Sequence, residues 1–143
     1  MMLFNTTQIN DAFVKESDNL VGKAFSFLEK IKMGGIGSSR FMIEEISEKL
    51  QPKNLQTLAT NYANIELRPK GIIVHFTNRL DRYSWIIPPY YRLVTYSTKT
   101  HTIHANGHFI KFKKNKNYDD NKKFIDKMIN LKISFLKLDY YDA

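Results

Sequence analysis

The spacing of apolar residues changes its period close to Tyr62, and this change limits the folds that the chain can adopt. Before Tyr62, apolar residues recur at helical spacing, as in residues 20–31. After Tyr62, apolar and polar residues alternate over several short runs, which is typical of strands with one buried face. Helices and strands in separate runs indicate an α+β protein rather than a parallel α/β sheet.

Three helices are predicted before the change of period. The first begins near Ser17 and ends at Gly34, a residue suited to the left-handed position after a helix. The second covers about residues 38–50. A third, short helix begins at Pro52. Residues 1–62 are therefore predicted to form a helical N-terminal segment that packs on the rest of the chain.

The alternating runs predict an antiparallel meander of about six strands, bent into a sheet or half-barrel. The strongest signal is Asn106-Gly107, which stands between two alternating runs and predicts a tight hairpin. This hairpin would pair Ala105 with His108 and His104 with Phe109. The predicted strands are residues 64–68, 71–77, 83–87, 90–97, 101–105 and 108–113.

The last part of the chain has the pattern of a long amphipathic helix. Asn117 or Asp119 can cap it, and an apolar stripe runs through residues 124–138 with most lysines outside the stripe. A helix laid across one end of a bent meander covers open edges and fills the core. Residues 63–143 are therefore predicted to form a meander-plus-helix unit, joined with residues 1–62 in one compact body.

Composition excludes several classes of protein. The chain has no cysteine, which rules out a disulfide scaffold, a zinc finger, cysteine-bound iron–sulfur clusters and a thiol nucleophile. No apolar run reaches the length of a membrane span, and the N-terminus lacks the pattern of a secretory signal. A cytoplasmic protein is therefore expected.

The net charge of +8 lies in the second part of the chain. Residues 1–60 carry seven Lys/Arg and seven Asp/Glu, whereas residues 61–143 carry fifteen and seven. Such asymmetry indicates an anionic partner, although a solubilising charge explains it equally well. Tyrosines lie among these cations, a mixture that suits single-stranded nucleic acid or a protein interface. The candidate residues for binding an anion or a partner are Arg79, Arg82, Arg92, Lys111, Lys113, Lys114 and Lys116.

No catalytic, metal or cofactor site is expected from the sequence. His101 and His108 share a face of the predicted hairpin but lie far apart along it, and His104 faces the other way. The glycine-rich residues 34–40 offer backbone amides to an anion but lack the lysine of a P-loop, so a linker between helices explains them better. No nucleophile–base pair can be recognised.

The order of elements in residues 83–131 resembles the second half of bacterial PH-like domains. Ile87-Pro88 ends an apolar strand, Asn106-Gly107 forms a hairpin, and Phe124-Ile125 lies in a closing helix. At the level of element order the resemblance covers residues 64–138. It implies a binding or scaffolding module, with lipid, peptide or self-association as its uses.

The leading hypothesis is therefore a small PH-like module, without catalysis, that acts by binding or self-association with a protein or an anionic ligand. Phe25, Phe27 and Leu28 spread around one predicted helix and offer more apolar surface than one packing face needs, which favours a dimer contact or a dock against the sheet. Three alternatives stay open: a nucleic-acid-binding protein that uses the basic C-terminal half, binding to an anionic membrane surface, and an enzyme with a histidine-containing pocket.

Overall fold

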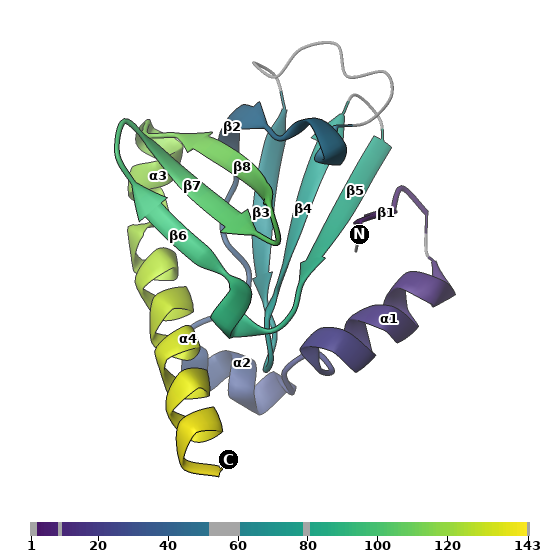
Figure 1. Cartoon of the computed structure of the whole chain (residues 1–143), viewed down its shortest axis with the longest axis vertical. Helices are drawn as coiled ribbons and strands as arrows, with labels where there is room; N and C mark the ends of the chain where they lie inside the picture. Colours follow the sequence, from purple (N-terminus) through teal and green to yellow (C-terminus); the bar gives the residue numbers. More distant parts are fainter. Residues whose placement is uncertain (1–2, 9, 52–60, 79–80, 143) are drawn as a thin grey trace.

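The computed structural model describes residues 3–8, 10–51, 61–78 and 81–142 (Figure 1). In these residues one antiparallel sheet has the strand order β1-β5-β4-β3-β2-β8-β7-β6. The strands are β1 (Leu3–Asn5), β2 (Phe41–Ile46), β3 (Tyr62–Leu67), β4 (Ile72–Asn78), β5 (Asp81–Ile87), β6 (Val94–Ser97), β7 (Thr100–Ala105) and β8 (His108–Lys113). The helices are α1 (Asp11–Val21), α2 (Phe27–Met33), α3 (Lys116–Asp120) and α4 (Lys122–Asp142), with 3-10 turns η1 (Glu48–Leu50) and η2 (Tyr90–Arg92).

The sheet bends at β2, which changes its partner along its length. Phe41 and Met42 pair with β3, whereas Ile43 and Ile46 pair with β8. The register shifts between Ile43 and Glu45, and a bulge of this kind bends a strand and increases its twist. As a result β6, β7 and β8 fold over the other strands, as Figure 1 shows.

One apolar core fills the space between the two halves of the bent sheet. Phe41 of β2 and Phe112 of β8 stack with their ring centroids 4.5 Å apart. α4 closes one end of the core through Phe124, Ile125 and Met128. Full burial of each large apolar side chain stabilises the fold by roughly 1.5–3 kcal/mol, so this core is the main source of stability.

The other face of β4 and β5 is covered by α1. Ile73 and Ile86 are fully buried there with Val21 in a second, smaller apolar cluster. The Asn10 side chain caps α1 by accepting a hydrogen bond from the Phe13 backbone amide at 3.1 Å. Because side chains alternate along a strand, the polar residues two positions away from these isoleucines, His75 and Ser84, face the same side, and they belong to the site described below.

The predicted six-strand meander is wrong, because the sheet has eight strands. Two of them, β1 and β2, lie in the part of the chain that was expected to be helical. Residues 41–46 form β2 where the second helix was predicted. The bulge explains the error: it turns both Ile43 and Ile46 inward, three positions apart, which imitates the spacing of a helix.

The first predicted helix, from Ser17 to Gly34, is wrong at its start and in its middle. α1 begins earlier, at Asp11, so Ser17 lies inside it, and the chain breaks at Gly22 in a positive-φ conformation (φ 86°) before α2. Ser26 and Glu29 then form a capping box that begins α2. Gly34 ends α2 in the left-handed conformation, as predicted. The third predicted helix, from Pro52, lies mostly outside the described residues. The described residues continue with Asn61, just before β3.

The predicted C-terminal helix is confirmed in part. The segment is split at Asn121 into the short α3 and the 21-residue α4, and Asn115 caps α3 in place of Asn117 or Asp119. The Asn121 side chain accepts a hydrogen bond from the Ser39 amide at 2.9 Å, which ties the break to the segment that precedes β2. Burial of Phe124, Ile125 and Met128 agrees with the first part of the predicted stripe.

The Asn106-Gly107 hairpin is confirmed with its predicted register. Both turn residues have positive φ, 54° at Asn106 and 84° at Gly107, as a two-residue hairpin of this kind requires. Ala105 pairs with His108, and His104 pairs with Phe109.

We expect Gly71→Ala to destabilise the protein by about 2–3 kcal/mol, because there is no room for a side chain at this position. A Cβ atom on Gly71 would lie 2.3 Å from the carbonyl oxygen of Ile87 and 2.8 Å from Cγ1 of Val21. Gly37→Ala is the matched control, since its Cβ would meet no atom within 4 Å. Urea unfolding of both variants measures the difference, and equal stabilities would contradict the tight contact at Gly71.

Candidate functional site

Polar side chains gather on the α1-facing surface of β3, β4 and β5. Strand register places His75 of β4 directly opposite Ser84 of β5. On the other side of β4, Glu66 of β3 pairs with Ile73 and therefore points to the same face. Three residues from three different strands thus meet on the face of the sheet that α1 covers.

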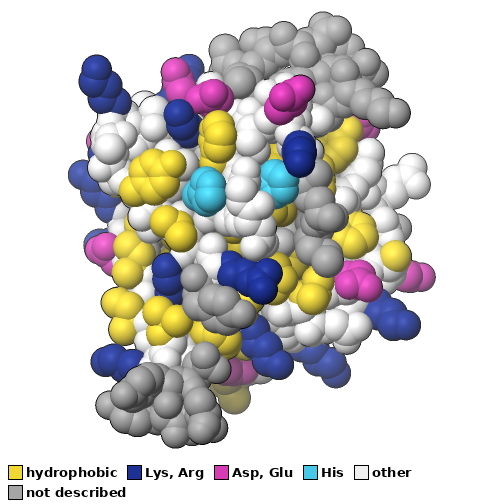
Figure 2. All heavy atoms as spheres, viewed as in Figure 1, with side chains coloured by type: hydrophobic (Ala, Val, Ile, Leu, Met, Phe, Trp, Pro, Cys, Tyr) yellow, Lys and Arg dark blue, Asp and Glu magenta, His cyan; other side chains and the backbone are white. Residues whose placement is uncertain are grey.

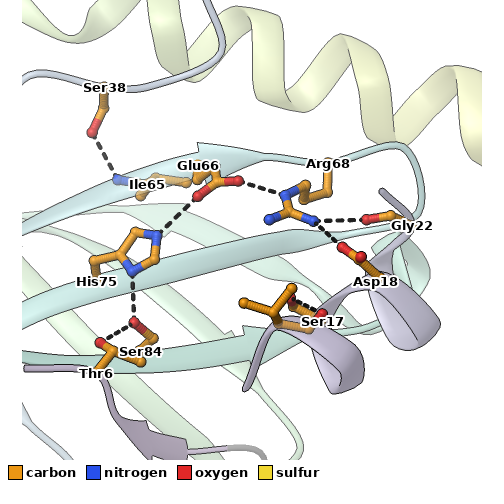
Figure 3. A network of polar contacts seen from close by, with 11 residues as sticks. Thr6, Ser17, Asp18, Gly22, Ser38, Ile65, Glu66, Arg68, His75 and Ser84 are labelled. Atoms are coloured by element: carbon orange, nitrogen blue, oxygen red, sulfur yellow. Dashed lines mark hydrogen bonds and ion pairs between the residues drawn. The ribbon is translucent and has the colours of Figure 1, made fainter. Parts of the chain in front are cut away.

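These side chains form a continuous chain of hydrogen bonds (Figure 3). His75 Nε2 lies 3.0 Å from Glu66 Oε1, and His75 Nδ1 lies 2.6 Å from Ser84 Oγ. Ser84 Oγ is in turn 2.7 Å from Thr6 Oγ1, beyond the end of β1. The network therefore links β1, β5, β4 and β3 through side chains in addition to the backbone ladder.

The ionisation of Glu66 sets the direction of these hydrogen bonds. Burial alone would raise the pKa of Glu66, but hydrogen bonds from His75 and Arg68 and the charge of Arg68 outweigh it and hold the pKa at about 2. An ionised carboxylate can only accept, so His75 donates from Nε2. Whenever the His75 ring is neutral, its Nδ1 accepts from Ser84, and the Ser84 oxygen accepts in turn from Thr6.

Arg68 extends the network to α1. Its Nε lies 2.5 Å from Glu66 Oε2, while Nη1 contacts Asp18 Oδ1 at 3.3 Å and donates to the Gly22 carbonyl at 2.8 Å. The backbone carbonyl of Arg68 also accepts a hydrogen bond from the buried Tyr90 hydroxyl. One guanidinium therefore holds the end of α1 against β3.

The serine, histidine and glutamate have the order of a nucleophile, a base and an orienting carboxylate. Ser84, however, is 0% exposed, and its hydroxyl already contacts both His75 and Thr6. A nucleophile must reach its substrate, so Ser84 does not meet this requirement in the present arrangement. The geometry instead gives the network a role in fixing the positions of His75 and its neighbours.

Two cavities open on either side of His75. The first has a volume of about 360 Å³ and lies under the beginning of α1. The second, of about 340 Å³, lies towards α2 and the segment that follows it. His75 and Arg82 line both cavities, so the two form one groove across the strands. The residues of the first are Thr6, Thr7, Gln8, Asn10, Phe13, Val14, His75, Arg82 and Ser84.

The candidate cations from the sequence are not gathered into one site. Lys111 lies 3.1 Å from Glu45, and Lys113 lies 4.0 Å from Glu44, so carboxylates of β2 offset the charge of β8. Lys114 donates to the Thr98 carbonyl. In Figure 2 Lys and Arg are scattered over the middle and the edges of the face, with Asp and Glu among them.

The remaining candidate cations lie on different parts of the molecule. Arg92 of η2 contacts Asn106 Oδ1 at 3.5 Å, and Lys116 is exposed at the start of α3. Arg82 of β5 lies in the groove. Arg79 lies outside the described residues. Of the predicted set, Arg82 therefore lines the two cavities beside His75.

His101 is separate from the groove, on β7. Its ring is 3% exposed and contacts the Tyr118 ring, with centroids 5.4 Å apart. Neither of its ring nitrogens has a hydrogen-bond partner within the described ranges. Burial, with a smaller effect of the Lys114 charge, lowers its pKa to about 4. His101 is therefore not among the residues that line the two cavities beside His75.

α2 presents the most exposed apolar side chains of the described chain. Phe27, Leu28 and Ile31 are 77%, 70% and 60% exposed, respectively. Met33 of α2 packs against the core, and at the end of the helix Lys127 of α4 donates to the Gly34 and Gly35 carbonyls. A mainly apolar hollow of about 320 Å³ lies beside it, lined by Met33, Lys127, Asn130, Leu131 and Ser134.

Sequence reasoning missed the Glu66–His75–Ser84 network. The sequence did contain one indication. Glu66, His75 and Ser84 each stand between two apolar residues of a predicted strand, which places each of them on the face opposite to those apolar residues. The pattern of one strand, however, does not say which strands become neighbours. The exposed α2 surface was foreseen in part, through Phe27 and Leu28.

Within the described residues, no three His, Asp or Glu side chains are placed to hold a metal ion together. None of the described helices combines the length and the apolar character needed to cross a membrane. The resemblance to PH-like domains stays a prediction. No protein-family model, curated protein or solved structure matches this chain.

Proposed function

We propose that this protein is a binding module that docks on an anionic membrane surface through α2. The observation that supports the proposal is the exposure of Phe27, Leu28 and Ile31, which leaves three large apolar side chains of one short helix in water. A patch of this kind on a folded protein marks a surface that is covered in use.

The arrangement of charge around these residues favours an anionic partner. At about 100° per residue, Phe27, Ile31 and Leu28 occupy one arc of α2, and Lys30 and Lys32 flank the arc on its two sides. Lys23, in the segment before α2, is also exposed. Apolar side chains bordered by lysines suit the boundary between anionic headgroups and acyl chains.

A lipid surface explains this composition better than a protein interface does. Lysine is depleted in protein–protein interfaces, where Tyr, Trp and Arg supply most of the binding energy. The apolar arc of α2 has none of these three residues, although Phe27 is of a type that is also enriched in such interfaces. A symmetric contact between two copies would also bring the lysines of both helices together, within a protein of net charge +8.

Sedimentation with vesicles tests the proposal. We expect binding to vesicles of phosphatidylcholine with phosphatidylglycerol, weak binding to phosphatidylcholine alone, and a fall in affinity with added salt. The triple variant Phe27→Gln/Leu28→Gln/Ile31→Gln should bind the anionic vesicles at least about tenfold more weakly, because the apolar contribution is lost. These residues are exposed, so the fold should be retained.

A matched control uses apolar residues exposed elsewhere. Val94 and Tyr96 of β6 are 45% and 47% exposed, and Val94→Thr/Tyr96→Thr should bind vesicles as the unmodified protein does. Absence of vesicle binding would overturn the proposal. A dimer in light scattering that dissociates in the triple variant would also overturn it, since α2 would then be covered by a second copy.

A further inference from the structure

We infer that the cavity under the beginning of α1 binds a small organic anion, with its carboxylate on Arg82 and its apolar part against Phe13 and Val14. This cavity is distinct from the α2 surface proposed above. Its volume of about 360 Å³ falls in the range of small-molecule sites. Three features of the lining support the inference: one free cation, a fixed polar floor and an apolar wall.

Arg82 supplies the free cation. Its backbone amide is held by Thr7 Oγ1 at 3.0 Å, which fixes the start of the side chain at the cavity. Its guanidinium has no hydrogen-bond or ion-pair partner among the residues that the structure describes. Among the described residues that line this cavity, the titratable groups are His75 and Arg82. A guanidinium binds a carboxylate through two parallel hydrogen bonds, so a monoanion matches this charge.

The floor of the cavity is polar, and its hydrogen-bonding capacity is already used. His75 contacts Glu66 and Ser84 through its two ring nitrogens, and Ser84 contacts Thr6. These bonds hold the floor in one arrangement before a ligand enters, which reduces the entropic cost of binding. Arg82, which is exposed beside this floor, is the cation that a ligand can reach without breaking these bonds.

The wall formed by α1 is apolar. Phe13 packs edge-on against the rings of Phe4 and His75, with centroids 5.6 Å and 6.4 Å apart. Val14, one residue further along α1, is 48% exposed although it lines the cavity. A short hydrocarbon or aromatic group of a ligand would cover Val14 and gain the free energy of apolar burial.

A neighbouring hollow limits where the anion can lie. Asn5, Asp11 and Asp81 are among the residues that line it, and its two carboxylates would repel a second negative charge. On the opposite side of His75, Glu66 is ionised and already paired with Arg68. The anionic group therefore has its favourable position at Arg82, between these two regions.

Phenylacetate is a suitable probe, because it joins one carboxylate to one ring. We expect it to give saturable shifts of the backbone amide signals of Thr7, Asn10, Val14 and Arg82 in a ¹H–¹⁵N NMR titration. The neutral 2-phenylethanol, which has the same ring and a similar chain, should bind about tenfold more weakly or not at all. Phenyl phosphate should not bind more tightly, because one guanidinium matches one negative charge.

Two variants and a control complete the test. Arg82→Gln removes the cation, and Val14→Glu places a carboxylate at the exposed edge of the wall; each should weaken phenylacetate binding about tenfold or more. Lys116→Gln removes an exposed cation from α3 and should leave binding unchanged. The spectra themselves report whether each variant is folded.

Three results would overturn the inference: shifts that map away from this cavity, equal binding of phenylacetate and 2-phenylethanol, and unchanged binding in Arg82→Gln. The triple α2 variant should bind phenylacetate as the unmodified protein does. A negative result with vesicles would therefore not contradict the inference about the cavity, and a negative result with phenylacetate would not contradict the proposal about α2.

Discussion

Replacement of Arg68 by methionine is expected to lower the free energy of unfolding by about 3 kcal/mol. Arg68 is 9% exposed, and its guanidinium contacts Glu66, Asp18 and the Gly22 carbonyl at once. Methionine fills similar space but removes the charge, so Glu66 is left ionised and half-buried with His75 as its remaining partner. Removing one member of a buried ion pair costs more than the pair itself contributes, because the other charge stays buried.

Urea unfolding of Arg68→Met measures this loss. Lys122→Met is the matched control, since Lys122 pairs with Asp119 at 3.4 Å and both side chains are 63% exposed. Exposed pairs of this kind contribute less than about 0.5 kcal/mol. The role given to Arg68 would be wrong if the two variants lost the same stability. Arg68→Met should also loosen α1, which would appear as faster amide hydrogen exchange in residues 11–21.

The second large effect is a loss of stability in mild acid that depends on His101. The pKa of His101 is about 4 in the folded protein, against an ordinary value of 6.5, chiefly because burial disfavours the charged ring. As the pH falls below 6.5, the unfolded chain takes up a proton that the folded protein does not, so unfolding becomes easier. The loss grows until the pH reaches the folded pKa and amounts to about 3 kcal/mol.

His101→Phe should remove this part of the pH dependence. Phenylalanine keeps an aromatic ring beside Tyr118 and removes two ring nitrogens that have no partner among the described residues. The variant should therefore be at least as stable as the unmodified protein at pH 7. Unfolding free energies measured between pH 7 and 4 should decline less in the variant. An equal decline in both proteins would show that His101 is not the titrating group.

Glu66 contributes in a lower pH window. Its pKa is about 2 when folded and 4.5 ordinarily, so the unfolded chain binds the proton first as the pH falls below 4.5. This stability is present above that pH and is lost progressively towards pH 2. In His101→Phe, the unfolding free energy should therefore begin to fall only near pH 4.5. Comparing the pH dependence of the two proteins distinguishes the effect of His101 from that of Glu66.

The candidate surfaces could be anticipated to different degrees. Phe27 and Leu28 were recognised as more apolar than a packed helix needs, and the structure shows them exposed. The sequence predicts Arg82 as a surface cation, but it does not predict the cavity beside this residue. Lys111 and Lys113 were grouped with it by their spacing in the sequence. The carboxylates opposite them belong to β2. The sequence predicts a helix there, because the bulge gives the buried residues of β2 a helical spacing.

Local interactions explain what the sequence alone determined. The Asn106-Gly107 turn, the left-handed Gly34 and the alternation of β4 and β5 depend on neighbours within a few residues, and these features are present in the structure. The cysteine count and the excess of positive charge are properties of composition and need no fold.

Tertiary structure decided the features that depend on which strands become neighbours. β2 is a strand because β3 and β8 provide hydrogen-bond partners on its two sides. Glu66, His75 and Ser84 meet because β3, β4 and β5 lie side by side in one register. The same pairing buries Glu66 beside Arg68 and leaves Arg82 facing a cavity. Burial and proximity set the charge state and the partners of these groups, and neither can be read from the spacing of residues along one chain.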